Sequence, residues 1–117
     1  ELADVAPTIL ELIGLPVPHY MQAKSLKGIL LGEADPDYHK DCVYAEYYYS
    51  ALASYPVYAT MYFDGRYKMI VHHDDPISEF YDLETDPCEY DNLWNKPEYR
   101  DLVFEYCQKC FNHAILI

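Results

Sequence analysis

Two short runs of side chains have the types and spacing that chemistry requires. His72-His73-Asp74-Asp75 places four metal ligands or proton carriers together, directly after a stretch rich in β-branched and aromatic residues. Cys107-Gln108-Lys109-Cys110 has the spacing of half a zinc site or of a redox pair. What each run can do depends on the secondary structure that positions it.

The histidine run ends the second strand of a predicted hairpin. Because successive residues of a strand point to opposite faces, His72 and His73 cannot both address one ion unless the strand has already ended. A solvated loop is the simplest interpretation of this run. Contact of the histidines with a substrate and an independent metal site are the two alternatives.

The cysteine pair lies on the apolar stripe of a predicted helix. No second Cys/His pair follows at the spacing of a zinc finger, so we expect Cys107 and Cys110 to pack in the core as inert thiols. With Cys42 and Cys88 the chain has four cysteines, too few for a disulfide scaffold at this length. Their redox state stays open, and with it the choice between a cytoplasmic and an extracytoplasmic location.

Other signatures of a self-contained active site are missing from the sequence. There is no Gly-rich phosphate loop, no Gly-x-Ser-x-Gly elbow and no His-Glu-x-x-His. The acidic residues between Asp82 and Asp91 lack the order of a calcium-binding loop. We therefore expect no catalytic residue and no metal site in the 117 residues.

Composition limits the partners. The 117 residues are 51% hydrophobic, which is enough apolar material for a core in one domain-sized chain. A formal net charge of -12 repels polyanions, so nucleic acid and anionic membranes are poor partner candidates. No stretch approaches the roughly 18 consecutive apolar residues that a membrane-spanning helix needs.

Alternating aromatic and β-branched residues predict four strands. They cover residues 42–49, 57–63, 66–72 and 78–83. Asp64-Gly65 joins the second and third as a type I′ hairpin, which would place Tyr62 opposite Tyr67 and Thr60 opposite Met69. One face of this hairpin is largely apolar and suits a covering helix.

Helical segments flank the strands. Asp4 as N-cap and Gly14 as C-cap bound a first helix, and residues 25–31 form one or two further turns. The last helix opens at Asn95 with Pro97 in its first turn. Its apolar stripe comprises Tyr99, Leu102, Val103, Tyr106, Cys107, Cys110, Phe111 and Ala114. The fold class is α+β: a four-stranded antiparallel sheet packed by a C-terminal helix and preceded by a short helical segment.

Two groups of motifs cover nearly the whole chain. The first is Asp4-Val5-Ala6-Pro7-Thr8, followed by Gly14-Leu15-Pro16-Val17-Pro18 and Met21-Gln22-Ala23-Lys24-Ser25-Leu26. The second is Gly65-Arg66-Tyr67-Lys68-Met69-Ile70, followed by Glu79-Phe80-Tyr81-Asp82-Leu83-Glu84-Thr85-Asp86-Pro87, Glu89 and Asn92-Leu93. In this order and separation they resemble the C-terminal portion of the sulfatase family, in the alkaline-phosphatase-like superfamily.

The resemblance implies a division of labour within a longer enzyme. Residues 1–41 would be a helical segment and linker that packs on an N-terminal catalytic domain, and residues 42–117 the C-terminal α+β subdomain. Sulfatases hydrolyse sulfate esters with a formylglycine and a divalent cation, usually calcium, and both sites lie upstream in the family. Ser54-Tyr55-Pro56-Val57-Tyr58 is the one partial match to the formylglycine motif, and it has Tyr58 where Arg is required. This chain is therefore expected to support catalysis and not to catalyse alone.

The resemblance also implies partners, and two alternative functions remain. A sulfated small molecule or glycan would be the substrate of the full enzyme, with His72 and His73 on its leaving-group side. The isolated piece is expected to self-associate through the apolar residues of its first helix. One rival is a phosphoester or phosphonate-ester hydrolase of the same superfamily. The other is a stand-alone acidic module whose tyrosine-rich sheet binds a partner or a glycan.

Overall fold

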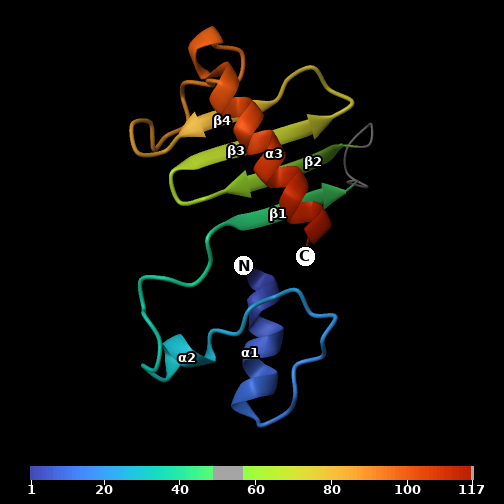
Figure 1. The fold of residues 1–117 in the computed structure, drawn as a ribbon, viewed down its shortest axis with the longest axis vertical. Helices are drawn as coiled ribbons and strands as arrows, with labels where there is room; N and C mark the ends of the chain where they lie inside the picture. The colour runs from blue at the N-terminus through green and yellow to red at the C-terminus, as the bar shows by residue number, and fades with distance from the viewer. Residues whose placement is uncertain (49–56, 117) are drawn as a thin grey trace. The chain divides into compact units, whose positions relative to one another are not determined.

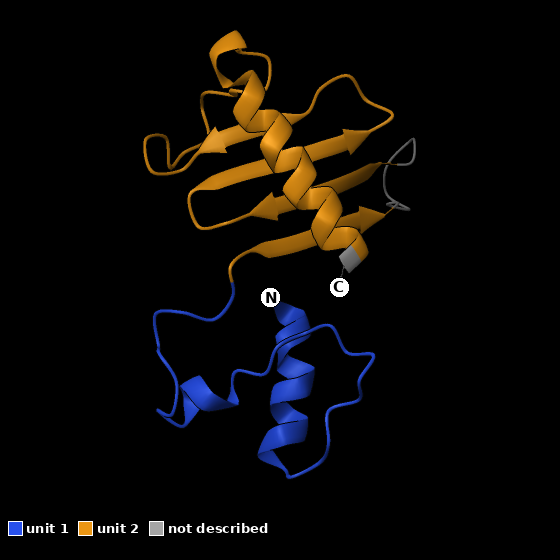
Figure 2. Ribbon diagram, in the orientation of Figure 1, with its two compact units in different colours: residues 1–40 blue, residues 41–117 orange. Residues whose placement is uncertain are grey.

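The computed structural model describes residues 1–48 and 57–116. They belong to two compact units, unit 1 (Glu1–Lys40) and unit 2 (Asp41–Ile117), which Figure 2 shows in different colours. In the described ranges no helix combines the length and the apolar character that crossing a membrane requires. The rejected nucleophile motif lies mostly outside the described residues, because it begins with Ser54-Tyr55-Pro56.

Unit 2 is built on one antiparallel sheet. Its strands are β1 (Val43–Tyr48), β2 (Tyr58–Phe63), β3 (Tyr67–His73) and β4 (Glu79–Asp82), in the order β1-β2-β3-β4. Helix α3 (Arg100–Leu116) lies across one face of the sheet (Figure 1). The predicted α+β architecture, a four-stranded sheet covered by a C-terminal helix, is confirmed.

The β2–β3 hairpin differs from the predicted one in register. Tyr62 pairs with Met69, two residues further along β3 than the expected partner Tyr67. A type I′ turn needs positive φ at both central residues, whereas here Gly65 (100°) has it and Asp64 does not. The Asp64 carboxylate instead accepts a hydrogen bond from the backbone N–H of Tyr67 at 2.9 Å and stabilises a longer turn. Because the shift is even, each side chain keeps its predicted face.

The core of unit 2 lies between the sheet and α3. Its buried members are Tyr62, Met69, Phe80, Leu93, Val103, Tyr106 and Cys110. The Phe80 ring stacks on Tyr67 with centroids 5.5 Å apart and meets Tyr106 edge-on at 5.2 Å. Burial of these aromatic side chains holds the helix on the sheet.

The start of the last helix corrects one prediction. A 3-10 turn at Pro97–Tyr99 precedes α3, and its N-cap is Lys96 rather than Asn95. The residue before a proline is restricted to extended backbone, and Lys96 has φ −79° and ψ 124°, so the helical conformation begins only after it. The buried side of α3 is also shorter than the predicted apolar stripe of the last helix, because Phe111 near the end of α3 is exposed.

Unit 1 contains α1 (Val5–Leu12) and the short α2 (Lys27–Leu30). The C-cap of α1 is Ile13, one residue before the predicted Gly14, and Gly14 follows it with a positive φ of 76°. Asp4 occupies the N-cap position of α1, as predicted, but without the capping contact expected of it. Asp4 has helical backbone angles and its side chain makes no capping hydrogen bond, because its carboxylate binds other segments of unit 1.

Candidate functional site

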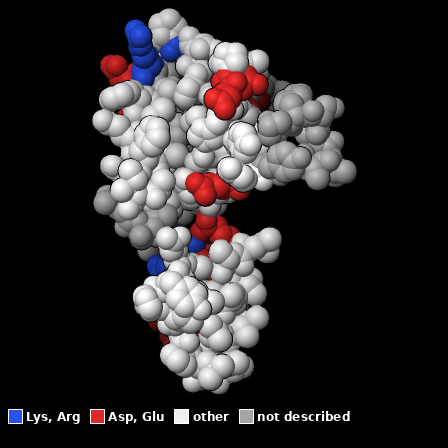
Figure 3. All heavy atoms as spheres, turned by 90° about the vertical axis from the view of Figure 1, so that its right-hand side faces the viewer, with Lys and Arg blue, Asp and Glu red and all other residues white. Residues whose placement is uncertain are grey.

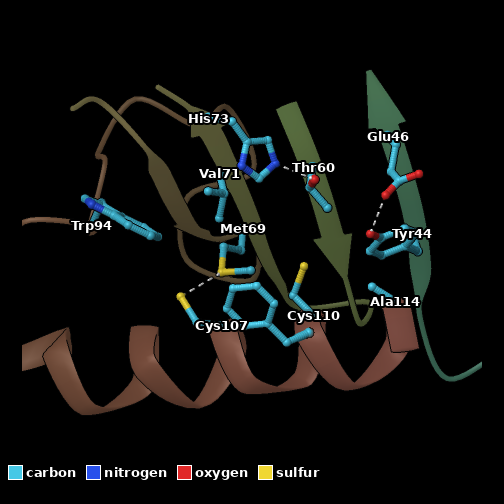
Figure 4. Close-up of a pocket in the computed structure, with 11 residues that line it drawn as sticks. Tyr44, Glu46, Thr60, Met69, Val71, His73, Trp94, Cys107, Cys110 and Ala114 are labelled. Carbon is cyan, nitrogen blue, oxygen red and sulfur yellow. Dashed lines mark hydrogen bonds between the residues drawn. The ribbon is translucent and has the colours of Figure 1, made fainter. Parts of the chain in front are cut away.

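Two hollows in unit 2 share Glu46, Thr60 and His73 in their linings. The first, which we call the helix cavity, lies between α3 and the sheet and has a volume of about 290 Å³ (Figure 4). The second, which we call the tyrosine hollow, has a volume of about 700 Å³ and lies where β1 and β3 end and β2 begins. Its lining comprises Glu46, Tyr47, Tyr48, Tyr58, Ala59, Thr60 and His73.

The strand register explains the tyrosine hollow. Tyr48 pairs with Tyr58, and Tyr58 pairs with His73, so three rings form a row across β1, β2 and β3. Paired residues of neighbouring strands point to the same face of a sheet. Thr60 lies two residues further along β2 on that face, and a hydrogen bond of 2.8 Å joins its Oγ1 to His73 Nε2. This bond orients the imidazole at the edge of both hollows.

His72 and His73 are not brought together. His72 Nε2 lies 2.7 Å from Glu79 Oε1 on β4, whereas His73 binds Thr60 on β2. Consecutive strand residues alternate between faces, and these partners confirm that the two imidazoles point to opposite sides of the sheet. A metal ion bound by both side chains is therefore excluded by the geometry.

Glu79 is the centre of a small polar network on the face opposite α3. Its second oxygen, Oε2, accepts a hydrogen bond from the Tyr81 hydroxyl at 2.9 Å. Burial opposes ionisation of Glu79, but the hydrogen bonds from His72 and Tyr81 outweigh it and lower its pKa. Burial, together with the bond to Glu79, raises the pKa of Tyr81 to about 12. The carboxylate thus stays ionised between two donors.

The residues that carry the family resemblance in unit 2 have structural roles. The Arg66 guanidinium donates to both carboxylate oxygens of Asp82, at 3.1 and 2.8 Å, and lowers the pKa of that carboxyl. Lys68 forms an ion pair with Glu89. The Asn92 side chain accepts from the backbone N–H of Phe80 and donates to the carbonyl of Ser78, which fastens the loop after β4 to that strand.

The first motif also has a structural role, in unit 1. The Asp4 carboxylate is fully buried and accepts hydrogen bonds from the Lys24 backbone N–H at 2.9 Å and from Lys40 Nζ at 2.7 Å. Burial opposes its ionisation, but these bonds prevail and lower the pKa of Asp4 to about 2. Thr8 Oγ1 accepts from the Leu26 N–H at 2.8 Å. These contacts join the start of the first helical segment to the chain on both sides of α2.

The four cysteines differ in their surroundings, and Cys42 Sγ lies 3.6 Å from His113 Nδ1. All four are free, and Cys110 is buried in the core, as predicted. Burial raises the pKa of both Cys107 and Cys110, which disfavours the reactive thiolate. Over residues 1–48 and 57–116, no group of three or more His, Cys, Asp or Glu side chains could hold a metal ion.

Sequence reasoning missed two features. It considered a tyrosine-rich binding sheet only as an alternative and did not single out Tyr48, which is 82% exposed, or Tyr47, which is 50% exposed. It also treated Asp4 as a helix cap rather than as the centre of an ionic cluster. The run Tyr47-Tyr48 at the end of a strand was the available signal for the first. The second had no local signal, because Lys24 and Lys40 are distant in the chain.

Comparison with known proteins places these features in a family. The sequence model of the family described as "N-sulphoglucosamine sulphohydrolase, C-terminal" matches residues 2–114. An N-acetylglucosamine-6-O-sulfatase of Bacteroides thetaiotaomicron is 33% identical over an alignment of 100 positions, and the match covers 82% of this chain and 18% of the relative. The multifunctional alkaline phosphatase superfamily protein PehA of Trinickia caryophylli is 27% identical over an alignment of 121 positions, and the match covers 96% of this chain and 24% of the relative.

Solved structures agree with this assignment. A putative sulfatase of Bacteroides thetaiotaomicron superposes with a TM-score of 0.82 at 27% identity, covering 94% of this chain and 23% of its own. A protein solved in complex with its substrate D-glucosamine-2-N,6-O-disulfate superposes with a TM-score of 0.79 at 29% identity, covering the same shares. This chain spans about a fifth of the length of the curated relatives that it matches. Since the family model matches nearly every residue, the chain belongs to the N-sulphoglucosamine sulphohydrolase C-terminal family, a C-terminal domain of sulfatases.

Proposed function

We propose that this chain completes a sulfuric ester hydrolase as its C-terminal domain, supporting the catalytic part and shaping the substrate cleft. The match of the family model to residues 2–114 carries this proposal. The chain's share of its relatives, 18% and 24%, leaves the larger part of such an enzyme outside these residues. The motif residues described above support the same role, because their side chains bind one another and nearby backbone groups of this chain.

The cofactors of the reaction belong, in this proposal, to that larger part. Formylglycine would supply the nucleophilic oxygen, and calcium would stabilise the charge on the transferred sulfuryl group. The described residues offer no cluster of side chains that fits a metal ion. This domain would act on the reaction only by positioning its partner and the sugar or aryl group of the substrate.

Unit 1 supplies the surface for the catalytic part. Several apolar side chains of its first helical segment and of the following turn are about half exposed or more: Leu2, Val5, Ile9, Leu12, Ile13 and Leu15. The first four recur at intervals of three and four residues, which places them along one side of the helix. Exposed apolar stripes of this kind mark interfaces. We assign this stripe to the N-terminal catalytic domain.

Of the two histidines, His73 is the candidate for contact with the leaving group. It lines both hollows, and its bond to Thr60 fixes the ring. His72 was also a candidate for the leaving-group side, but it points to the opposite face of the sheet, where it binds Glu79. We propose that His72 stabilises the β3–β4 edge and that His73 alone faces the substrate.

The test uses the full-length hydrolase that contains this chain. Matched aryl sulfate and aryl phosphate substrates are assayed side by side, and faster hydrolysis of the sulfate is expected. The 117 residues alone are expected to hydrolyse neither. Turnover of any ester by this chain alone would contradict the proposed division of labour.

A second candidate is hydrolysis of phosphoesters or phosphonate esters. The similarity to PehA, a multifunctional member of the alkaline phosphatase superfamily, supports this second candidate. The same paired assay separates the two chemistries, since preference for the aryl phosphate would select this second candidate. The 33% identity to a sulfatase places sulfate-ester hydrolysis first.

A further inference from the structure

We propose that the tyrosine hollow binds an unsulfated sugar ring, the neighbour of the sulfated unit in a glycan substrate. The inference rests on the proposed function and adds to it a binding subsite, the chemistry of its ligand and the residues that form it. Those residues are the ring row Tyr48, Tyr58 and His73, with Glu46 and Thr60 behind it.

The aromatic side chains favour a flat, partly apolar ligand. The Tyr48 and Tyr58 rings lie 4.8 Å apart at an angle of 51° and so form a shallow angled platform. Tyr48 is 82% exposed, so the fold itself does not bury this large apolar surface. The C–H face of a pyranose is apolar and matches such a ring face, while its edge carries hydroxyl groups.

The second row supplies partners for those hydroxyl groups. Glu46 and Thr60 are directly paired on β1 and β2, one step inward from the tyrosines on the same face. Glu46 Oε1 accepts the Tyr44 hydroxyl at 2.9 Å, which fixes the carboxylate on the side of Tyr44 (Figure 4). A carboxylate accepts several hydrogen bonds, and Thr60 can both donate and accept. Sugar hydroxyl groups are ligands of matching chemistry.

Charge argues against a sulfated ring in the tyrosine hollow. Among the described residues that line it, there is one carboxylate, that of Glu46, and no Lys or Arg. Asp74 and Asp75 follow His73 directly along the chain and add negative charge at this end of the sheet. In Figure 3, which views the molecule from this side, acidic side chains of unit 2 are interspersed with uncharged surface, and the basic ones lie at its upper left edge. Like charges repel, so a sulfate would be disfavoured here.

The size of the tyrosine hollow also suits one sugar ring. Neighbouring strands are about 4.8 Å apart, so a row across three strands spans roughly 10 Å. A volume of about 700 Å³ lies in the range of small-molecule sites, roughly 300–1,000 Å³. The site therefore has room for one sugar ring and its hydroxyl groups.

The kinetic test compares two substrates in the full-length hydrolase. One is a sulfated monosaccharide, and the other is the same unit extended by one unsulfated hexose. We expect Tyr48→Ala to raise KM for the extended substrate about fivefold more than KM for the monosaccharide, the size of one aromatic contact. Tyr48→Phe keeps the ring face and should restore the wild-type ratio.

A matched control and a measurement independent of turnover complete the test. Tyr90→Ala removes another exposed tyrosine of unit 2, 89% exposed and outside the lining, and should leave the KM ratio unchanged. Saturation-transfer NMR with the free unsulfated hexose should show binding to the wild type that Tyr48→Ala and Tyr58→Ala each lose. Circular dichroism verifies that both variants are folded.

The outcomes separate this inference from the proposed function. Equal changes of KM for both substrates, or a hexose signal that survives both alanine variants, would overturn the sugar subsite while sulfate-ester hydrolysis by the wild type still stands. A wild-type enzyme that hydrolyses no sulfate ester would refute the proposed function, and the subsite as a substrate site with it.

Discussion

Units 1 and 2 bury opposite kinds of side chain. In unit 2 the fully buried large side chains are Phe80 and Met69, packed between a sheet and a helix. In unit 1 they are Asp4 and Pro7, while the apolar side chains of α1 are largely exposed. Unit 2 thus has a hydrophobic core of its own, the main source of folding free energy. Unit 1 is organised by a polar cluster and leaves much of its apolar surface exposed.

This contrast separates the two roles that one chain can have in an enzyme. A region with its own core can hold a precise surface, such as the ring row at the end of the sheet. A region without one is stabilised by what it binds, since burial against a partner supplies the missing apolar contacts. Four experiments test the difference between the two units.

The largest effect is expected in the core of unit 2. Phe80→Ala removes a fully buried ring that stacks on Tyr67, and should lower the free energy of unfolding by about 3–5 kcal/mol. Urea unfolding followed by circular dichroism measures the change. Phe104→Ala on α3 is the matched control, because the Phe104 side chain is 64% exposed. Its free energy of unfolding is expected to stay within about 0.5 kcal/mol of the wild-type value. Equal losses in the two variants would show that unit 2 has no specific core.

The next effect tests the polar centre of unit 1. Asp4→Asn removes the charge that pairs with Lys40 and should destabilise unit 1 by about 1–3 kcal/mol. Amide hydrogen exchange at Leu26, whose N–H binds Thr8, should accelerate, while the core of unit 2 stays protected. Asp35→Asn at an exposed turn is the control and should change little. Unchanged exchange at Leu26 in Asp4→Asn would show that unit 1 does not depend on this cluster.

Acid should weaken unit 1 through the same side chain. The pKa of Asp4 is about 2 in the folded chain, below its ordinary value of 3.8, so folding favours the ionised form. The resulting stabilisation, about 2 kcal/mol, is present above roughly pH 4 and is lost as the pH falls towards 2. Hydrogen exchange of unit 1 at a series of pH values measures it, after correction for the intrinsic rate. In Asp4→Asn this component should disappear, and a parallel acid response in the variant would count against Asp4 as its source.

The smallest effect per side chain concerns the exposed stripe of α1. The isolated chain should self-associate at micromolar concentration. The double change Ile9→Ser and Leu12→Ser should raise the Kd of this association roughly tenfold or more, because each buried apolar side chain contributes about 1 kcal/mol. Light scattering across a concentration series gives the Kd. A double change of Phe104 and Phe111 to Ser on α3 serves as the comparison, because both side chains are also exposed. A wild-type chain that stays strictly monomeric would contradict the assignment of the α1 stripe to an interface.

Much of the fold could be predicted because its signals are local. Alternation along residues 57–63 and 66–72 identified β2 and β3, and the apolar positions Val103, Tyr106 and Cys110 identified the buried side of α3. The helix boundary at Asn95 was missed because the restriction that Pro97 places on Lys96 outweighed the capping preference.

The candidate site could be predicted only in part. His73 was named from its place at the end of a strand, but the partners that make it part of a site were not. Tyr48, Tyr58 and Thr60 lie on other strands, and strand pairing brings them to His73. The sequence offered only an abundance of tyrosine, which sheet packing explains equally well.

The sequence by itself determined the family, the order of strands and helices, and the face on which each strand side chain lies, because motifs, turn residues and a period of two are all local properties of the chain. Tertiary structure decided the two-residue shift of the β2–β3 register, the burial of Asp4 among lysines from distant segments, and the row formed by Tyr48, Tyr58 and His73. These depend on which remote segments meet, and the free energy of such contacts is settled only when the chain has packed.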